Sequence, residues 1–292
     1  MSCRIPDHAS TDIPKLARAD ALRALNEDTA DGDLTAALIA ADARARARVV
    51  LREEATVCGA PWVEAVIRHV DPQAAIRWHC AEGQRCHAGE IVLELEGSAR
   101  ALLTGERTAL NFLQLLSAVA TCTTAFVDAV RGTRAQIVDT RKTLPGLRLA
   151  QKYAVRIGGG TNHRIGLFDA ILIKENHILA AGGIAQALAA AARAASGARF
   201  VEIEVETLAQ LEAALAHGAR MVLLDNMDLA TLREAVRIND AAGEARAVLE
   251  ISGGVTRESV RALAETGVDR ISIGALTKDV KAIDFSMRFE GA

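Results

Sequence analysis

The strongest constraint on the fold of this chain is a regular alternation, from about residue 135 onward, between short apolar runs and helical segments. The runs occupy residues 137–138, 170–173, 200–205, 221–224, 247–251 and 270–273. Buried parallel strands are short and apolar, and the return connection between two of them usually contains a helix. The alternation therefore predicts an α/β fold in which the runs form a parallel sheet or a barrel.

The first hundred residues lack this alternation and predict a separate, mixed domain. Helices are expected near residues 14–27 and from about Pro61, because proline suits the first turn of a helix. Strands are expected near residues 46–57 and 90–96. Residues suited to chemistry are sparse in this part, so the second part is expected to hold most of the functional side chains.

Residues 108–127 carry no charge, and on length alone such a stretch permits a membrane span. Its polar residues recur every three or four positions, which places them on one face of a helix whose other faces are rich in leucine. These polar residues are Thr108, Asn111, Gln114, Ser117, Thr121 and Thr124. We therefore expect a long amphipathic helix packed inside a soluble protein, without a membrane partner.

Composition limits the partners and the compartment. The 34 basic and 37 acidic residues leave a net charge of −3, and only 3% of residues are aromatic. A polybasic surface and a base-stacking platform are both missing from this composition, so no nucleic-acid partner is expected. The first fifteen residues contain no apolar segment of the kind found in secretory signals, and we expect a cytoplasmic protein.

The five cysteines form no C-x-x-C pair, and their odd number does not suit a disulfide framework, so reduced thiols are expected. A zinc site at His79, Cys80, Cys86 and His87 is an alternative interpretation. The five-residue gap between the two cysteines exceeds the usual spacing of zinc ligands, and residues 82–84 are typical of a hairpin turn. We therefore expect no metal there.

Polar residues follow almost every apolar run, at the point where the predicted strand ends. In an α/β barrel these ends meet at one mouth, which is the catalytic face. The alternative is that they are only turn and helix-cap residues, but charged side chains are unusually frequent among them. The set comprises residues 139–142, 174–176, Glu204, 225–226, 252–254 and Gly274.

Cationic side chains stand beside glycines in residues 139–148, 158–164 and 172–177. Such segments offer an anion both positive charge and closely approaching backbone N–H groups, so a small polyanionic ligand is implied. Neither a dinucleotide-binding fingerprint nor a P-loop motif is present.

Two glycine-containing loops follow the last two runs, and this is where barrels commonly bind phosphate. The residues concerned are Ser252, Gly253, Gly254 and Gly274. The alternative is that these glycines only permit tight turns.

Strand alternation places Glu202, Glu204 and Glu206 on one face of their strand, so at least one of them is buried or functional. We choose Glu204 because it is central. Glu204 and Asp225 end two neighbouring strands, where carboxylates can hold Mg²⁺ through water or accept hydrogen bonds from ribose hydroxyls.

The charged segments, together with residues 105–111, 152–155, 224–226 and 251–254, resemble the signature motifs of quinolinate phosphoribosyltransferase, the carboxylating nicotinate-nucleotide pyrophosphorylase. The likeness covers nearly the whole chain, including residues 27–28 and 32–35 near its start. It implies a glycosyltransferase of de novo NAD synthesis that joins quinolinate to phosphoribosyl pyrophosphate. The products are nicotinate mononucleotide, pyrophosphate and CO₂.

The resemblance also implies the architecture. An N-terminal α/β sandwich domain (residues 1–115) and an incomplete, six-stranded α/β barrel (residues 116–278) are expected, with a C-terminal tail (residues 279–292) that returns to the first domain. A homodimer, or a higher oligomer of dimers, with active sites shared between subunits is implied as well.

Matching motifs carry over the family's site residues. The quinolinate carboxylates are assigned to Arg107, Arg141, His163, Arg164 and Lys174. The ribose, pyrophosphate and Mg²⁺ end, and with it the catalytic role, is assigned to Lys142, Glu204 and Asp225. The 5′-phosphate is assigned to Ser252, Gly253, Gly254 and Gly274.

Three other functions fit parts of this pattern. A nicotinate-specific salvage transferase needs fewer cations than are present, because its substrate has a single carboxylate. A barrel lyase or aldolase acting on a sugar phosphate would form a Schiff base through Lys142 or Lys174. This alternative explains the cation cluster and the carboxylates of Glu204 and Asp225 less well. A non-catalytic homologue that only binds ligands or partners is the third, since a fold does not fix activity.

Overall fold

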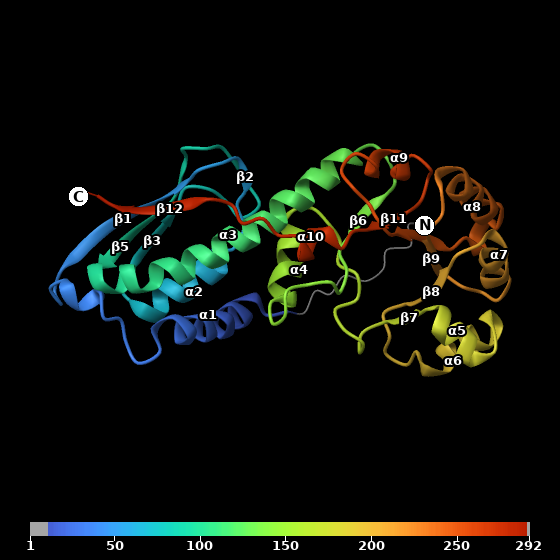
Figure 1. Ribbon diagram of the computed structural model, residues 1–292, viewed down its shortest axis with the longest axis horizontal. Helices are drawn as coiled ribbons and strands as arrows, with labels where there is room; N and C mark the ends of the chain where they lie inside the picture. The colour runs from blue at the N-terminus through green and yellow to red at the C-terminus, as the bar shows by residue number, and fades with distance from the viewer. Residues whose placement is uncertain (1–10, 291–292) are drawn as a thin grey trace. The chain divides into compact units, whose positions relative to one another are not determined.

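The computed structural model describes residues 11–290, which form two compact units. The barrel unit comprises residues 125–148 and 160–278, and the sandwich unit comprises residues 11–124, 149–159 and 279–290. Each is labelled by its elements in Figure 1. The predicted domain boundary at residues 115/116 falls inside helix α3 (Ala99–Ala129), and helix α4 (Arg148–Ile157) belongs almost entirely to the sandwich unit.

The barrel unit contains a six-stranded sheet in which every pair of neighbours is parallel, with the order β6-β11-β10-β9-β8-β7. All six predicted runs are strands, which confirms the α/β barrel interpretation. Their bounds are β6 (Gln136–Val138), β7 (Ile171–Ile173), β8 (Val201–Val205), β9 (Met221–Asp225), β10 (Val248–Ser252) and β11 (Arg270–Ser272).

Helices follow the strands and cover the outer face of this sheet (Figure 1). Buried residues such as Leu211 and Leu232 face the strands, whose outward residues Ile203 and Leu224 are likewise buried. The helices are α5 (Glu175–Ala181), α6 (Ile184–Ala194), α7 (Leu208–Ala216), α8 (Leu229–Ala241), α9 (Val260–Ala264) and α10 (Ala275–Lys278).

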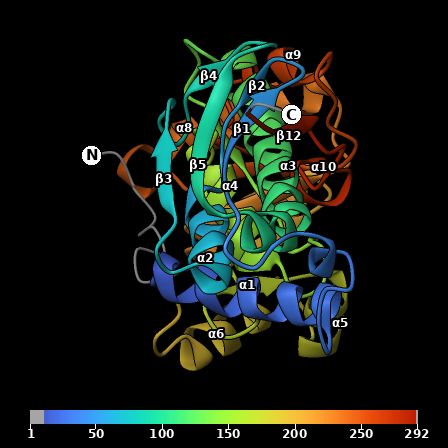
Figure 2. The same ribbon diagram turned by 90° about the vertical axis from the view of Figure 1, so that its left-hand side faces the viewer.

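The sandwich unit has an antiparallel sheet with the order β12-β1-β5-β3. Helices α1 (Ile13–Thr29) and α2 (Ala60–Val70) lie together on one side of it (Figures 1 and 2). The helices predicted near residues 14–27 and from Pro61 are thus confirmed. The strands are β1 (Arg44–Leu51), β3 (Ala75–Trp78), β5 (Ile91–Ser98) and β12 (Phe285–Phe289), and a second, small sheet pairs β2 (Ala55–Thr56) with β4 (Arg85–Cys86).

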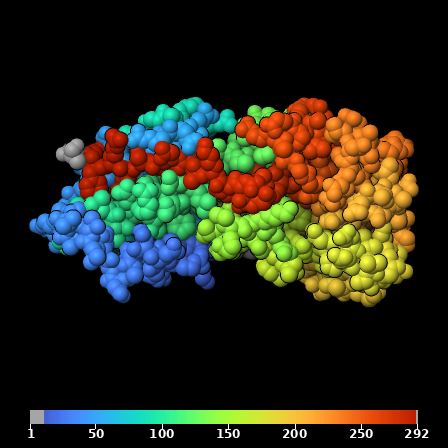
Figure 3. Space-filling view, viewed as in Figure 1, coloured from blue at the N-terminus to red at the C-terminus, as the bar shows by residue number. Residues whose placement is uncertain are grey.

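The C-terminal strand completes the sheet of the sandwich unit. β12 pairs with β1 in antiparallel register, with Val49 opposite Met287. Figure 3 shows this red segment lying against blue residues from the beginning of the chain. Strand β12 is therefore an edge strand of the sandwich sheet, and its first residue, Phe285, is buried.

Helix α3 is the predicted amphipathic helix, longer at both ends than expected. It is long and apolar enough to cross a membrane, but 56% of its most apolar window is buried inside the protein. Its polar face satisfies backbone groups of the sandwich unit: Ser117 Oγ bonds both the N–H and the carbonyl of Cys58, at 3.0 and 3.1 Å, and Thr121 Oγ1 accepts from Thr56 N at 2.9 Å. Helix α3 is therefore a core helix.

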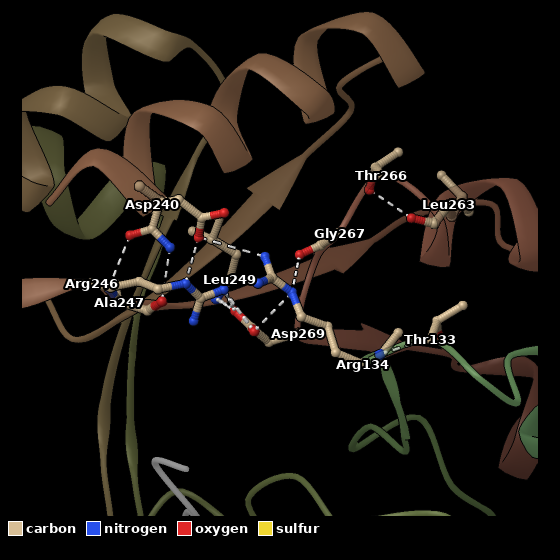
Figure 4. A network of polar contacts seen from close by, with 12 residues as sticks. Thr133, Arg134, Asp240, Arg246, Ala247, Leu249, Leu263, Thr266, Gly267 and Asp269 are labelled. Atoms are coloured by element: carbon tan, nitrogen blue, oxygen red, sulfur yellow. Dashed lines mark hydrogen bonds and ion pairs between the residues drawn. The ribbon is translucent and has the colours of Figure 1, made fainter. Parts of the chain in front are cut away.

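An ion-pair network ties together the beginnings of β10 and β11, at the amino ends of the barrel strands (Figure 4). The Asp269 carboxylate accepts two bonds from Arg246 Nη2, at 2.7 and 2.8 Å, and one from the backbone N–H of Leu249 at 2.8 Å. Arg134 approaches the same carboxylate at 3.5 Å and donates to the Gly267 carbonyl. The network thus links two neighbouring strands at the end opposite their carboxyl ends.

We expect Asp269→Asn to lower the free energy of unfolding by about 1–2 kcal/mol. The substitution removes the negative charge that accepts two bonds from the partly buried Arg246. Urea unfolding measures the change. Activity of the folded variant should be unaltered, and a variant as stable as wild type would show that the network contributes nothing.

Candidate active site

Strand register brings four of the predicted site residues to one face of the barrel sheet. Glu204 pairs with Leu223, and Ser252 pairs with Asp225. Because side chains alternate along a strand, Leu223 and Asp225 share a face, and so do their partners. Lys174, two residues beyond Leu172, follows the same face and approaches Glu204 Oε2 with its Nζ at 3.5 Å.

The glycine loop after β10 lies beside Asp225. Gly253 and Gly254 have φ values of +101° and +57°, which a residue with a side chain rarely adopts. A Cβ built on Gly253 would lie 3.7 Å from Asp225 Oδ1. The loop therefore presents exposed backbone next to a carboxylate at the carboxyl end of β9.

A hollow of about 350 Å³ adjoins this loop. Ser252 and Gly253 line it together with Asn226, and Leu224 and Ile251 supply apolar walls. Asn226 itself has a positive φ of 53°, so the backbone after β9 is held in an unusual conformation at this point.

Lys142 and Gly274, predicted from distant parts of the sequence, lie side by side. A Cβ on Gly274 would come within 3.0 Å of Lys142 Cδ. The Lys142 backbone is anchored because its N–H donates to Thr140 Oγ1 at 3.0 Å and its carbonyl accepts from Thr277 Oγ1 at 2.8 Å. The absence of a side chain at residue 274 is thus what leaves room for the exposed lysine.

The segment with His163 and Arg164 runs next to β6. Thr161 forms a parallel bridge with Val138, and its backbone bonds Ile137 and Asp139 at 2.8 and 3.1 Å. By alternation from Thr161, the His163 side chain faces the inside of the barrel. The segment acts as a short extra strand beside the sheet.

Arg141 and Arg164 form a concentration of positive charge. Burial, and after it the charge of Arg141, lowers the pKa of Arg164 from its usual value. Arg141 Nε is buried and has no hydrogen-bond partner among the described residues. Two guanidinium groups this close are unfavourable alone and favourable around an anion.

Two buried carboxylates, Asp139 and Asp169, shape the loops that carry these cations. Asp139 accepts from the N–H of His163 at 2.9 Å and from Asn162 Nδ2 at 2.6 Å. Asp169 accepts from the N–H groups of Ile165 and Gly166, both at 2.9 Å. Asp139 was expected only as one of the polar residues after a strand, and no role was predicted for Asp169.

Arg148 also has a structural role that the sequence did not reveal. Its guanidinium donates to Thr143 Oγ1 and to the Ile165 carbonyl, both at 3.1 Å, and to the Arg141 carbonyl at 3.4 Å. It therefore joins the loop after β6 to the segment that holds Arg164.

A second polar layer lies inside the barrel, below the residues at the strand ends. The side chains of Glu202 and Glu250 are fully buried, and Arg270 is 3% exposed. His163 Nε2 lies 2.8 Å from Glu202 Oε2 and 3.5 Å from Glu250 Oε1, and Arg270 Nε lies 2.9 Å from Glu250 Oε2. These residues include the one cluster among the described residues that has the ligand types and spacing of a metal site: His163, Glu202 and Glu250.

The prediction that at least one of Glu202, Glu204 and Glu206 is buried or functional is confirmed, but the completely buried member is Glu202. Glu204, which we chose, retains 16% exposure at the strand end, and Glu206 is exposed. Glu250 and Arg270 were missed altogether. Glu250 is a charged residue inside an apolar run, and Arg270 is the charged first residue of one, and that was the available signal.

The charges of this layer act on His163. Burial favours its neutral form, but the charges of Glu250 and Glu202 outweigh burial and raise its pKa. The backbone N–H of Arg164 donates to its Nδ1 at 2.7 Å, which requires that nitrogen to be unprotonated. We assign the proton to Nε2, since this form satisfies both contacts.

Arg107, the remaining predicted site residue, lies on helix α3 in the sandwich unit and is exposed. All the other predicted site residues lie in the barrel unit.

An incomplete parallel barrel with clustered cations, two carboxylates and a glycine loop at its strand ends defines an enzyme class that handles small anionic, phosphorylated substrates. Comparison with known proteins identifies the family. The model of the quinolinate phosphoribosyl transferase N-terminal domain matches residues 33–117, and that of the C-terminal domain matches residues 119–288. The chain belongs to the quinolinate phosphoribosyl transferase family, whose members are decarboxylating pentosyltransferases of NAD synthesis.

Individual relatives agree with this membership. The chain is 43% identical over 275 residues to the nicotinate-nucleotide pyrophosphorylase (carboxylating) of Mycobacterium leprae, covering 93% of this chain and 96% of that one. It is 42% identical over 261 residues to a probable enzyme of the same name from Bacillus subtilis, covering 89% of each. The structure of nicotinate-nucleotide pyrophosphorylase from Francisella tularensis matches with a TM-score of 0.92 and 44% identity, covering 98% of this chain and all of that one.

We expect Gly274→Ala to raise the KM for phosphoribosyl pyrophosphate several-fold, because the new Cβ displaces Lys142 by a few tenths of an ångström. The KM for quinolinate should change little. Initial-rate kinetics with each substrate varied in turn measure both constants. Equal effects on the two, or none, would show that contact between these residues does not position Lys142.

Proposed function

We propose that the mouth of the barrel binds quinolinate and phosphoribosyl pyrophosphate together and joins them. This proposal rests on two different groups of residues at one end of the barrel. Clustered arginines lie on the β6 side, and carboxylates with a glycine loop lie at the ends of β8, β9 and β10. An acceptor with two carboxylates requires the first, and a ribose bearing phosphates and Mg²⁺ requires the second.

The quinolinate end consists of Arg141, Arg164 and Lys174, with His163 behind them and Arg107 contributed by a second subunit. The planar fork of arginine pairs with a carboxylate through two parallel bonds, so it orients a flat dicarboxylate better than lysine does. The unpartnered Nε of Arg141 and the depressed pKa of Arg164 support a site prepared for negative charge.

The other end holds the phosphoribosyl group. Lys142 is assigned to the pyrophosphate, and the backbone of Ser252, Gly253, Gly254 and Gly274 to the 5′-phosphate. The positive φ values of Gly253 and Gly254 favour this role, because a loop without side chains lets an anion approach its N–H groups.

Mg²⁺ is assigned to Glu204 and Asp225. Both are partly exposed carboxylates that project from neighbouring strands to the same face, and hard oxygen donors suit this ion. Two protein ligands leave most of the coordination sphere to water and substrate oxygens, as Mg²⁺ prefers. When bound, the ion would neutralise charge on the departing pyrophosphate.

The residues of this chain contribute positioning and electrostatics to the reaction. The ring nitrogen of quinolinate attacks the anomeric carbon of the ribose as the bond to pyrophosphate breaks. The positively charged ring then stabilises the electron pair left when the adjacent carboxylate departs as CO₂. A proton must be delivered to that ring carbon, and no covalent bond to the enzyme is required.

We also propose that the chain is a homodimer with shared sites. Large apolar side chains are exposed on both compact units: Leu34 and Leu38 on the sandwich unit, and Leu167, Phe168 and Leu179 on the barrel unit, all at least 76% exposed. Such exposure is typical of surfaces that are covered in an oligomer.

A cytoplasmic location is proposed from the thiols. Cys58, Cys80, Cys86 and Cys122 are free in the structure, while Cys3 lies outside the described residues. Burial raises the pKa of Cys80 to about 12, so this thiol resists oxidation through its thiolate.

Substrate choice tests the proposed function. Nicotinate lacks one carboxylate and would leave part of the positive charge of Arg141, Arg164 and Lys174 unpaired. Its kcat/KM should therefore fall about a hundredfold or more below that of quinolinate. Formation of nicotinate mononucleotide and CO₂ is measured for the wild type, with Arg164→Ala as the variant expected to lose the preference. Comparable kcat/KM values for both acids would refute the assignment.

The shared site is tested by mixing two inactive variants. Arg107→Ala and Lys142→Ala homodimers should each be nearly inactive, whereas a heterodimer has one site with both defects and one with neither. Random mixing gives about half heterodimers, so activity should return to about a quarter of wild type. Proven heterodimers without recovery would place Arg107 in the site of its own subunit.

A further inference from the structure

The four residues of the buried layer, His163, Glu202, Glu250 and Arg270, come from four separate segments of the barrel unit. The segment after Thr161 and strands β8, β10 and β11 each supply one of them. None of their side chains is more than 8% exposed. The layer is therefore out of reach of the proposed substrates, and any effect on them must pass through other residues.

A continuous chain of contacts leads from Glu202 to Arg164. Glu202 Oε2 lies 2.8 Å from His163 Nε2, and His163 Nδ1 accepts from the N–H of Arg164 at 2.7 Å. Because Nδ1 acts as an acceptor, the ring donates through Nε2 to Glu202. With both nitrogens occupied, His163 has no free nitrogen for a substrate carboxylate in this arrangement.

We propose that Glu202 is a positioning residue for the quinolinate site: it fixes the ring of His163, which in turn holds the backbone at Arg164 so that the guanidinium faces the substrate. The inference rests on the proposed function, and it changes the role of His163 from a direct ligand to a link. Glu250, which lies 3.5 Å from His163 Nε2 and is paired with Arg270, completes the layer from β10 and β11.

A metal ion is a weaker explanation of the same cluster. Arg270 already supplies a cation 2.9 Å from Glu250, and a divalent ion between the carboxylates would lie close to this guanidinium. A purely structural role is the other explanation, since buried ion pairs also hold folds together. Substitutions of Glu202 can distinguish a positioning role from an effect of its charge and from a purely structural role.

Two conservative variants of Glu202 separate position from charge. Glu202→Gln keeps the length and an acceptor oxygen, and its amide can donate to Glu250 Oε1, which accepts no hydrogen bond among the described residues. The KM for quinolinate should therefore stay within about threefold of wild type. Glu202→Asp keeps the charge but is too short to reach His163, so this KM should rise about tenfold or more. The KM for phosphoribosyl pyrophosphate should change little in both.

His163→Asn tests whether Glu202 acts through the ring. Its side-chain oxygen can replace Nδ1 as the acceptor for Arg164 N–H, but the contact with Glu202 is lost. If Glu202 acts through His163, adding Glu202→Asp to His163→Asn should raise the quinolinate KM no further. Additive effects of the two substitutions would overturn the proposal.

Asp269→Asn is the matched control for stability, because it weakens an ion-pair network at the opposite strand ends (Figure 4). It should destabilise the protein without changing the quinolinate KM. The proposal is wrong if Glu202→Asp resembles this control, losing stability alone, or if Glu202→Gln raises the quinolinate KM as much as Glu202→Asp does.

Nitrogen NMR of the histidine rings gives a readout that does not depend on turnover, with the His163 signals identified by their loss in His163→Asn. The wild type should show an unprotonated Nδ1 and a protonated Nε2, and Glu202→Asp should shift the Nε2 signal. A proton on Nδ1 in the wild type would refute the inference. A wild type with the expected signals that does not convert quinolinate would instead refute the proposed function and leave the His163 link standing.

Discussion

The parallel register of the barrel strands is the constraint on which the rest of this structure depends. Since side chains alternate along each strand and neighbouring strands are in register, every second residue contributes to an interior layer. Glu204, Asp225, Ser252, Glu202, Glu250 and Arg270 all lie on this inward face. The first three are partly exposed at the strand ends, and the last three are buried. A shift of one residue in β8 would turn its glutamates outward and place Ile203 and Val205 inside.

Much of the fold was predictable because its signals are local. Each barrel strand was recognisable as an apolar run, and each long helix by its periodicity or by its proline, as at Pro61. The polar face of α3 was also predicted from the sequence. The structure explains it, because Ser117 and Thr121 accept hydrogen bonds from the segment around β2. Helix α4, in contrast, is grouped with the sandwich unit because of contacts with distant residues, which its own sequence does not encode.

The candidate site could be predicted only in part, because some of its contacts join residues that are distant in the sequence. Charged residues at strand ends stand out in the sequence, and Lys142, Glu204 and Asp225 were found in this way. Alternation told us that a glutamate of β8 faces inward, but not which charges from other strands meet it. The bridge between Thr161 and Val138 places His163 beside Glu202, which is 39 residues away in the sequence. A single β-bridge has no local sequence pattern by which it could be predicted.

The two interior layers also explain how a protein of net charge −3 can present a cationic mouth. Burial, and after it the charge of Arg141, lowers the pKa of Arg164. The charge of Glu202, held below them without access to solvent, acts in the opposite direction on Arg164. Burial and the charge of Glu250 raise the pKa of Glu202, while its hydrogen bond with His163 and the charge of Arg270 oppose that rise. Its carboxylate contacts His163, so it does not take the place of a substrate carboxylate at the mouth. Because Glu202 is held by His163 and not by Arg164, the outward face of the guanidinium stays free for an anion, which a surface carboxylate in direct contact with Arg164 would not allow.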